Sequence, residues 1–215
     1  DVTRTVTRFS RSQPDQLIET DWERARWSAE EPDHDLGRRR ARAAALVQLA
    51  LPGTAYVYQG EELGLPQAHV PFERLVDPEA IANWPETLGR DGARTPIPWV
   101  ASAPNAGFST VEPWLPVDPR HLALAVDAQE ADPTSILHAA RRIIALRQAH
   151  PALRTGGLEI ESASDLLVFR RFERAEGGER LLCVFNLSSQ PVTAMLGAAI
   201  PSTLALAATA LVLAV

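Results

Sequence analysis

The chain has 215 residues and a formal charge of −6 at pH 7, because 27 acidic residues outnumber 21 basic ones. Hydrophobic residues make up 46% and charged residues 22%, the balance of a globular protein with enough chain for one large domain or two small ones. Nucleic-acid-binding domains are usually basic, so a nucleic-acid-binding surface is not expected. The single cysteine, Cys183, excludes an internal disulfide and any metal site built on several cysteines. Because the sequence begins with Asp1 rather than Met, we expect a processed product or part of a longer protein.

The first regular element expected along the chain is a helix at residues 36–51. Asp33 and Asp35 precede a run of strong helix formers, and Pro52-Gly53 ends it. Residues 54–58 are rich in β-formers without polar alternation, which predicts a fully buried strand of a parallel sheet. The polar residues 59–62 follow this strand, so we expect a functional site at its carboxyl end.

Residues 63–132 form a long Pro-rich segment with little periodicity, and a loop of this length in a compact domain is usually functional or disordered. Its scattered aromatic residues need burial or a ligand, which favours function.

A second helix is predicted from Pro133 to His150, with Asp132 as its N-cap. The apolar period then changes to two at 158–161, 166–170 and 180–185, with a Gly177-Gly178 turn that predicts a hairpin. The uncharged tail after residue 191 is interrupted by Pro201, so buried strands or a frayed end are expected rather than a membrane span.

The polar chemistry of the chain concentrates in residues 90–99 (RDGARTPIPW). Two arginines, an acid and a tryptophan in one rigid loop can serve as a salt-bridged anchor of the loop. They can also form a polar, aromatic-edged wall for a hydroxyl-rich ligand. The triplet Asp33-His34-Asp35 contains metal-ligand types, but a solvated helix start explains it more simply, and no metal site is predicted.

Five motifs in order carry a family resemblance: DVTR at 1–4, LGRRRARA at 36–43, LPGTAYVYQGEELG at 51–64, GRDGARTPIPW at 89–99 and NAGFS at 105–109. Together they resemble the C-terminal third of an α-glucosidase of the α-amylase superfamily (glycoside hydrolase family 13), in its oligo-1,6-glucosidase-like branch. The resemblance covers residues 1 to about 190.

The resemblance implies an α/β fold, namely the C-terminal part of a (β/α)₈ TIM barrel, incomplete in this chain, followed by a small antiparallel β domain. Residues 1–154 would hold the last βα units of the catalytic barrel, with the long active-site loop at 63–132. Residues 155–215 would form the all-β C-terminal domain. The stretch from Tyr56 to Glu62 would be the eighth barrel strand and the mouth that follows it.

The implied activity is that of a retaining α-glucosidase hydrolysing α-linked gluco-oligosaccharides. By the resemblance, Asp1 stabilises the transition state, Arg4 lies beside it in the substrate cleft, and Arg90 holds the non-reducing-end glucose. Arg94 belongs either to the same substrate-binding wall or to a structural anchor. The family's nucleophile and acid/base precede Asp1, so the 215-residue chain alone is expected to be inactive.

The expected partner is an oligosaccharide or disaccharide substrate, with no nucleic acid, no membrane and a cytoplasmic location. No cofactor is expected, apart from a calcium site that would lie in the missing N-terminal part. A trehalose synthase-type isomerase of the same family is the alternative function. A non-catalytic barrel homologue of the transporter heavy-chain type is a further one, although it would not need a sugar-binding wall. A free-standing carbohydrate-binding module is disfavoured by the αβ unit.

Overall fold

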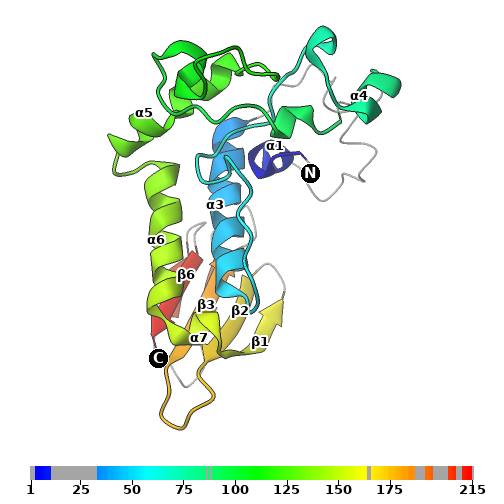
Figure 1. Ribbon diagram of the computed structural model, residues 1–215. Helices are drawn as coiled ribbons and strands as arrows, with labels where there is room; N and C mark the ends of the chain where they lie inside the picture. The colour runs from blue at the N-terminus through cyan, green and yellow to red at the C-terminus, as the bar shows by residue number, and fades with distance from the viewer. Residues whose placement is uncertain are drawn as a thin grey trace. The chain divides into compact units, whose positions relative to one another are not determined.

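The computed structural model describes residues 3–10, 33–85, 87, 89–163 and 166–186, and the backbone of 192–195, 203–206 and 210–214 (Figure 1). The chain divides into two compact units. Unit 1 consists of Asp1–Arg42 and Val57–Ala139, and unit 2 of Ala43–Tyr56 and Ala140–Val215.

Unit 1 is built from short helices joined by irregular chain. α3 (His34–Ala50) begins in this unit, with Asp35 in its acidic first turn. The Leu36 N–H donates to Asp33 Oδ1 over 2.8 Å, so Asp33 satisfies a backbone donor at the start of the helix. The other helices of the unit are α1 (Thr5–Phe9), η2 (Phe72–Arg74), α4 (Pro78–Ala82), η3 (Asp91–Ala93), η4 (Pro104–Gly107), η5 (Pro119–Leu124), α5 (Val126–Glu130) and the start of α6 (Ile136–Ala149). The described residues of the segment 63–132 thus form several short helices joined by irregular chain.

Two apolar clusters hold unit 1 together. Val70, Leu75, Ala80 and Leu115 form the first, with Trp84 packed against it. The second joins Leu63, Leu65 and Leu137 to the partly buried residues Ile97, Leu124 and Val126. Both clusters use residues from widely separated parts of 63–137, which explains how a segment without periodicity acquires a fixed conformation.

Unit 2 contains an antiparallel sheet of order β1-β2-β3-β6, with β1 at one edge and β6 at the other (Figure 1). Its strands are β1 (Gly157–Ala163), β2 (Leu166–Phe172), β3 (Arg180–Asn186) and β6 (Ala210–Ala214). A separate antiparallel pair joins β4 (Val192–Met195) and β5 (Thr203–Leu206). The predicted hairpin of β2 and β3 is confirmed, and its register runs from Leu166 opposite Asn186 to Phe172 opposite Arg180.

The core of unit 2 lies where β2 and β3 meet helices. Phe169 and Phe185 stack with ring centroids 5.5 Å apart. The residues around them come from the end of α3, from α6, from the short helix α7 (Pro151–Arg154) and from the strands, and are Leu46, Val47, Ala50, Leu146, Ala152, Leu153, Leu181 and Cys183. Burial raises the pKa of the Cys183 thiol to about 12, so the lone cysteine is a packing residue without thiolate character.

The strand expected at residues 54–58 is absent from the described structure, and this prediction is wrong for the chain as it stands. The segment has no regular secondary structure, and the exposed fractions of Tyr56 and Val57 are 78% and 50%. A fully apolar strand is stable only when neighbouring strands take up its backbone hydrogen bonds, and no described strand pairs with this segment.

The second predicted helix begins later than expected. α6 starts at Ile136, because Asp132 Oδ1 accepts the N–H and the hydroxyl of Thr134 in a local turn (2.8 and 2.7 Å). Ser135 then provides the hydroxyl that accepts the His138 N–H over 3.3 Å. Asp132 is thus a turn residue, and Ser135 caps the helix.

The division of the chain at residue 155 stays a prediction. The antiparallel strands do begin at Gly157, and in unit 2 they pack with residues from the last turns of α3 and from α6. Among the residues that the structure describes, no helix is long and apolar enough to cross a membrane.

Candidate functional site

Arg4 joins three separated segments of unit 1. Only 2% of the residue is exposed, and its guanidinium donates from Nη1 to the Gln59 carbonyl (2.5 Å) and from Nη2 to the Ala93 carbonyl (2.9 Å). Its backbone N–H donates to Gln67 Oε1 over 3.0 Å. Arg4 therefore fixes the start of α1 to the residues after 58 and to the RDGARTP loop.

The residues around Arg4 accommodate its guanidinium and favour its positive charge. Burial lowers the pKa of Arg4, and the nearby Tyr58 side chain and the charges of Glu62 and Glu61 oppose this by favouring the protonated form. Gly60 has a φ of +85°, and a Cβ at this position would lie 2.5 Å from Arg4 Nη1. Glycine is thus required at residue 60 both by the backbone and by the space that Arg4 occupies.

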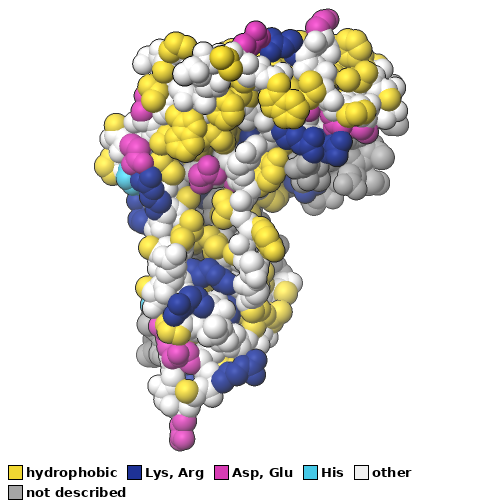
Figure 2. Space-filling model, viewed as in Figure 1, with side chains coloured by type: hydrophobic (Ala, Val, Ile, Leu, Met, Phe, Trp, Pro, Cys, Tyr) yellow, Lys and Arg dark blue, Asp and Glu magenta, His cyan; other side chains and the backbone are white. Residues whose placement is uncertain are grey.

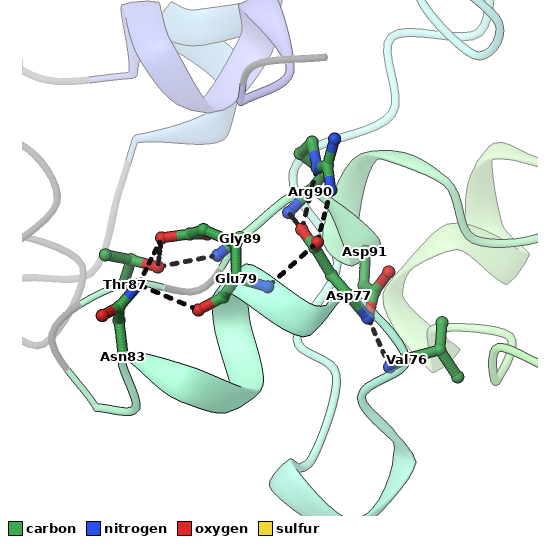
Figure 3. Close-up of polar contacts among 8 residues, drawn as sticks. All are labelled: Val76, Asp77, Glu79, Asn83, Thr87, Gly89, Arg90 and Asp91. Carbon is green, nitrogen blue, oxygen red and sulfur yellow. Dashed lines mark hydrogen bonds and ion pairs between the residues drawn. The ribbon is translucent and has the colours of Figure 1, made fainter.

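Arg90 forms a two-point ion pair with Asp77 (Figure 3). Arg90 Nε donates to Asp77 Oδ2 over 3.0 Å, and Nη2 donates to Oδ1 over 2.5 Å. The side chain of Asp77 is completely buried, whereas 47% of the Arg90 side chain is exposed. The hydrogen bonds from Arg90 hold the pKa of Asp77 well below its usual range, although burial acts in the opposite direction.

The loops carrying Asp77 and Arg90 also fix each other through their backbones (Figure 3). Asp77 Oδ2 accepts the Arg90 N–H (2.8 Å), while Asp91 Oδ2 accepts the N–H groups of Val76 (2.7 Å) and Asp77 (2.9 Å). Gly89 has a φ of +55°, and a Cβ there would lie 2.6 Å from Asp77 Oδ2. This close packing gives the RDG turn a single conformation.

The other acidic and basic residues considered for the site have the following positions and contacts. Arg94 is partly buried at the end of η3, and its N–H donates to the Asp91 carbonyl over 2.9 Å. Glu61 accepts the Thr5 hydroxyl, and Glu62 accepts the Gly60 N–H over 2.8 Å, so both carboxylates hold local chain. Asp1 lies outside the described residues. The roles predicted for Asp1, Arg4, Arg90 and Arg94 toward a substrate stay predictions.

Aromatic side chains of the Pro-rich segment are exposed in unit 1, and Figure 2 shows large hydrophobic side chains on the face that it presents. The exposed fractions are 51% for Trp99 and 69% for Trp114. A pocket of about 360 Å³ in the same segment is lined by Arg74, Asn105 and Glu112 among others. Among the described residues, no group of three or more His, Cys, Asp or Glu side chains is arranged to hold a metal ion.

Asp77 and Gln67 are the residues of this site that the sequence did not reveal. The Asp77-Pro78 pair is a recognisable helix start, and the Asp77 side chain does accept the Glu79 N–H of α4. Nothing in that local signal indicates that the same carboxylate also binds an arginine 13 residues further on.

Much of this chain resembles known proteins in sequence. The family model of the α-amylase catalytic domain matches residues 16–156. A probable alpha-glucosidase of Rhizobium meliloti (strain 1021) is 44% identical over 170 residues, which are 79% of this chain and 30% of the relative. An oligo-1,6-glucosidase of Parageobacillus thermoglucosidasius is 32% identical over 73% of this chain and 31% of the relative.

Among solved structures, an alpha-glucosyl transfer enzyme is similar with a TM-score of 0.75 and 35% identity, over 100% of this chain and 38% of that one. A trehalulose synthase from Pseudomonas mesoacidophila MX-45 has a TM-score of 0.63 and 28% identity, over 81% of this chain and 36% of that one. The chain thus spans about a third of the length of these proteins. The catalytic-domain model matches more than half of the residues of this chain, and the chain therefore belongs to the α-amylase family.

Proposed function

We propose that this chain is part of a retaining α-glucosidase that hydrolyses α-linked gluco-oligosaccharides or disaccharides. The observation that carries the proposal is the 44% identity to a probable alpha-glucosidase over four-fifths of the chain. Relatives named glucan 1,6-alpha-glucosidase and oligo-1,6-glucosidase support the same substrate class. No metal or organic cofactor is proposed for the described residues, and a cytoplasmic location remains part of the proposal.

The polar residues of unit 1 suit a hydroxyl-rich ligand. The half-exposed guanidinium of Arg90 is anchored along one edge, so the rest of its surface has a defined direction for contacting sugar hydroxyls. Arg4 ties the segment that follows Asp1 to the RDGARTP loop through the Ala93 carbonyl. We propose that Asp1 stabilises the transition state and that Arg90 binds the non-reducing-end glucose, with Arg94 in the supporting loop.

We infer that the nucleophile and the acid/base are supplied by protein segments other than these 215 residues. A retaining glycosidase needs two carboxyl groups about 5–5.5 Å apart, and the described carboxylates Glu61, Glu62, Asp77 and Asp91 are each occupied in holding backbone or side-chain partners. A (β/α)₈ barrel also needs about 250 residues. We propose that residues 54–58 pair with barrel strands of the complete protein.

The test compares the complete protein encoded by the gene with the 215-residue chain. The complete protein is expected to release glucose from maltose or isomaltose, and the 215-residue chain is expected to release none. Failure of the complete protein on both disaccharides and on their longer homologues would contradict the proposed activity. Turnover by the 215-residue chain would contradict the assignment of the reactive carboxyl groups to other segments.

An isomerase is the second candidate, because solved neighbours include trehalulose synthase structures. The two functions differ in the acceptor, which is water in a hydrolase and a sugar hydroxyl in an isomerase. Product analysis separates them. Glucose release in proportion to substrate loss indicates hydrolysis, whereas a new disaccharide at constant total disaccharide indicates isomerisation.

A further inference from the structure

The Asp77–Arg90 pair divides the arginine into a buried edge and an exposed remainder. Nε and one N–H of Nη2 point into the interior, where the Asp77 carboxylate is completely buried (Figure 3). A two-point pair of this kind fixes the plane of the guanidinium as well as its position.

The carboxylate is itself held rigidly. Asp77 sits at the N-cap of α4, its own N–H is bound by Asp91, and its Oδ2 binds the Arg90 backbone N–H. Gly89 leaves no free space beside that oxygen, because a Cβ there would meet both Asp77 Oδ2 and Ala80 Cβ at 2.6 Å. The direction of the guanidinium is therefore set by α4 and the RDG turn together.

We propose that Asp77 is a positioning residue for substrate binding, which orients Arg90 toward the sugar without touching the sugar itself. The inference rests on the proposed function, in which Arg90 binds the terminal glucose. A fixed guanidinium loses less conformational entropy on binding than a mobile one, so its contact with a sugar hydroxyl is stronger. Because this contact is made to the bound substrate and to the transition state alike, its loss raises KM more than it lowers kcat.

The experiment uses the complete protein and the substitution Asp77→Asn, which preserves the size of the side chain. Asparagine offers one acceptor oxygen and no charge, so the two-point pair is lost. KM for the disaccharide is expected to rise about tenfold, while kcat changes by less than about twofold.

Asp118→Asn is the matched control. Asp118 is also buried and also binds an arginine at two points, from Arg120 Nε to Oδ1 (3.0 Å) and from Nη2 to Oδ2 (2.6 Å). Burial raises the pKa of Asp118, but the hydrogen bonds from Arg120 outweigh it and hold the value at about 2. The control is expected to lower the melting temperature, as Asp77→Asn does, and to leave KM within about twofold of the wild type.

A double variant tests whether Asp77 acts through Arg90. If it does, Asp77→Asn combined with Arg90→Gln raises KM no further than Arg90→Gln alone. The inference would be overturned if the KM rise in the double variant equalled the product of the rises in the two single variants. An unchanged KM in Asp77→Asn, or an equal rise of KM in Asp118→Asn, would overturn it as well.

Two further measures keep the test decisive. If Asp77→Asn does not fold, Asp77→Glu retains the charge but displaces the guanidinium by one methylene, and the same rise in KM is expected, whereas an unchanged KM would overturn the inference. A wild-type protein without glycosidase activity would refute the proposed function. Normal wild-type turnover with an unaffected Asp77 variant would refute only the role of Asp77.

Discussion

Arg171 is a buried cation whose partners are all backbone carbonyls. It has no exposed surface, and its guanidinium donates to the carbonyls of Ala50, Gly156 (3.1 Å) and Gly157 (3.0 Å). Burial lowers the pKa of Arg171. Ala50 is the last residue of α3, so Arg171 on β2 satisfies a helix-terminal carbonyl that would otherwise be unpaired.

We predict that Arg171→Lys destabilises unit 2 by about 2 kcal/mol, because an ammonium group cannot reach three carbonyls in the planar arrangement of a guanidinium. Chemical unfolding of the complete protein, followed by the exchange of β2 and β3 amides, measures the effect. Arg154→Lys on the exposed side of α7 is the control and is expected to change nothing measurable. Equal stability of the two variants would show that the carbonyls do not need the guanidinium.

His121 is a buried histidine held in its neutral form. Burial lowers its pKa to about 4, and its Nε2 lies 2.9 Å from the Pro66 carbonyl, to which it donates. The ordinary pKa is 6.5, so between pH 6.5 and about 4 the unfolded chain binds a proton that the folded chain does not. The contribution of His121 to the free energy of unfolding is therefore complete above pH 6.5 and is lost as the pH falls toward 4.

We predict that acidification from pH 6.5 to pH 4 lowers the free energy of unfolding of unit 1 by roughly 3 kcal/mol through this histidine. Unfolding midpoints measured from pH 7 to pH 4 should fall less steeply in His121→Gln, whose amide can still donate to the Pro66 carbonyl. The same slope in the variant and in the wild type would contradict the assignment.

At the scale of elements, the sequence predicts those helices and strands that are determined by local periodicity and by capping residues. The helix α3 is predicted from its acidic start, its helix-forming residues and its Pro-Gly stop, whereas α6 and the strands β1, β2 and β3 are predicted from their apolar patterns. The start of α6 is missed by three residues, since Asp132 and Ser135 both resemble N-caps and only the structure shows which oxygen binds the helix. The Asp77–Arg90 pair is missed because it depends on tertiary contact between a helix start and a later turn.

Residues 54–58 show how an element depends on its neighbours. Their composition predicts a strand, but Tyr56 and Val57 are exposed, and no described strand pairs with them. We predict that the amides of 55–57 exchange with solvent rapidly in the 215-residue chain and at least about a hundredfold more slowly in the complete protein, where barrel strands would take up their hydrogen bonds. Equal exchange rates in the two proteins would contradict the proposed barrel strand.

At the scale of the whole molecule, family membership is better determined than activity. The family could be identified from five motifs in the sequence, and the catalytic-domain match supports it independently. The activity is a proposal, because the chain spans about 30% of the length of its glucosidase relatives. We propose that the residues described here supply the supporting part of the substrate site, namely the anchored Arg90 and the buried Arg4.

The stereochemistry of the first product tests the central claim most directly. Proton NMR of the complete protein acting on maltose or isomaltose records the anomer of the glucose released from the non-reducing end before mutarotation. A retaining α-glucosidase releases α-glucose, and that is the expected result. Initial release of β-glucose, or no release of glucose from either substrate, would contradict the account.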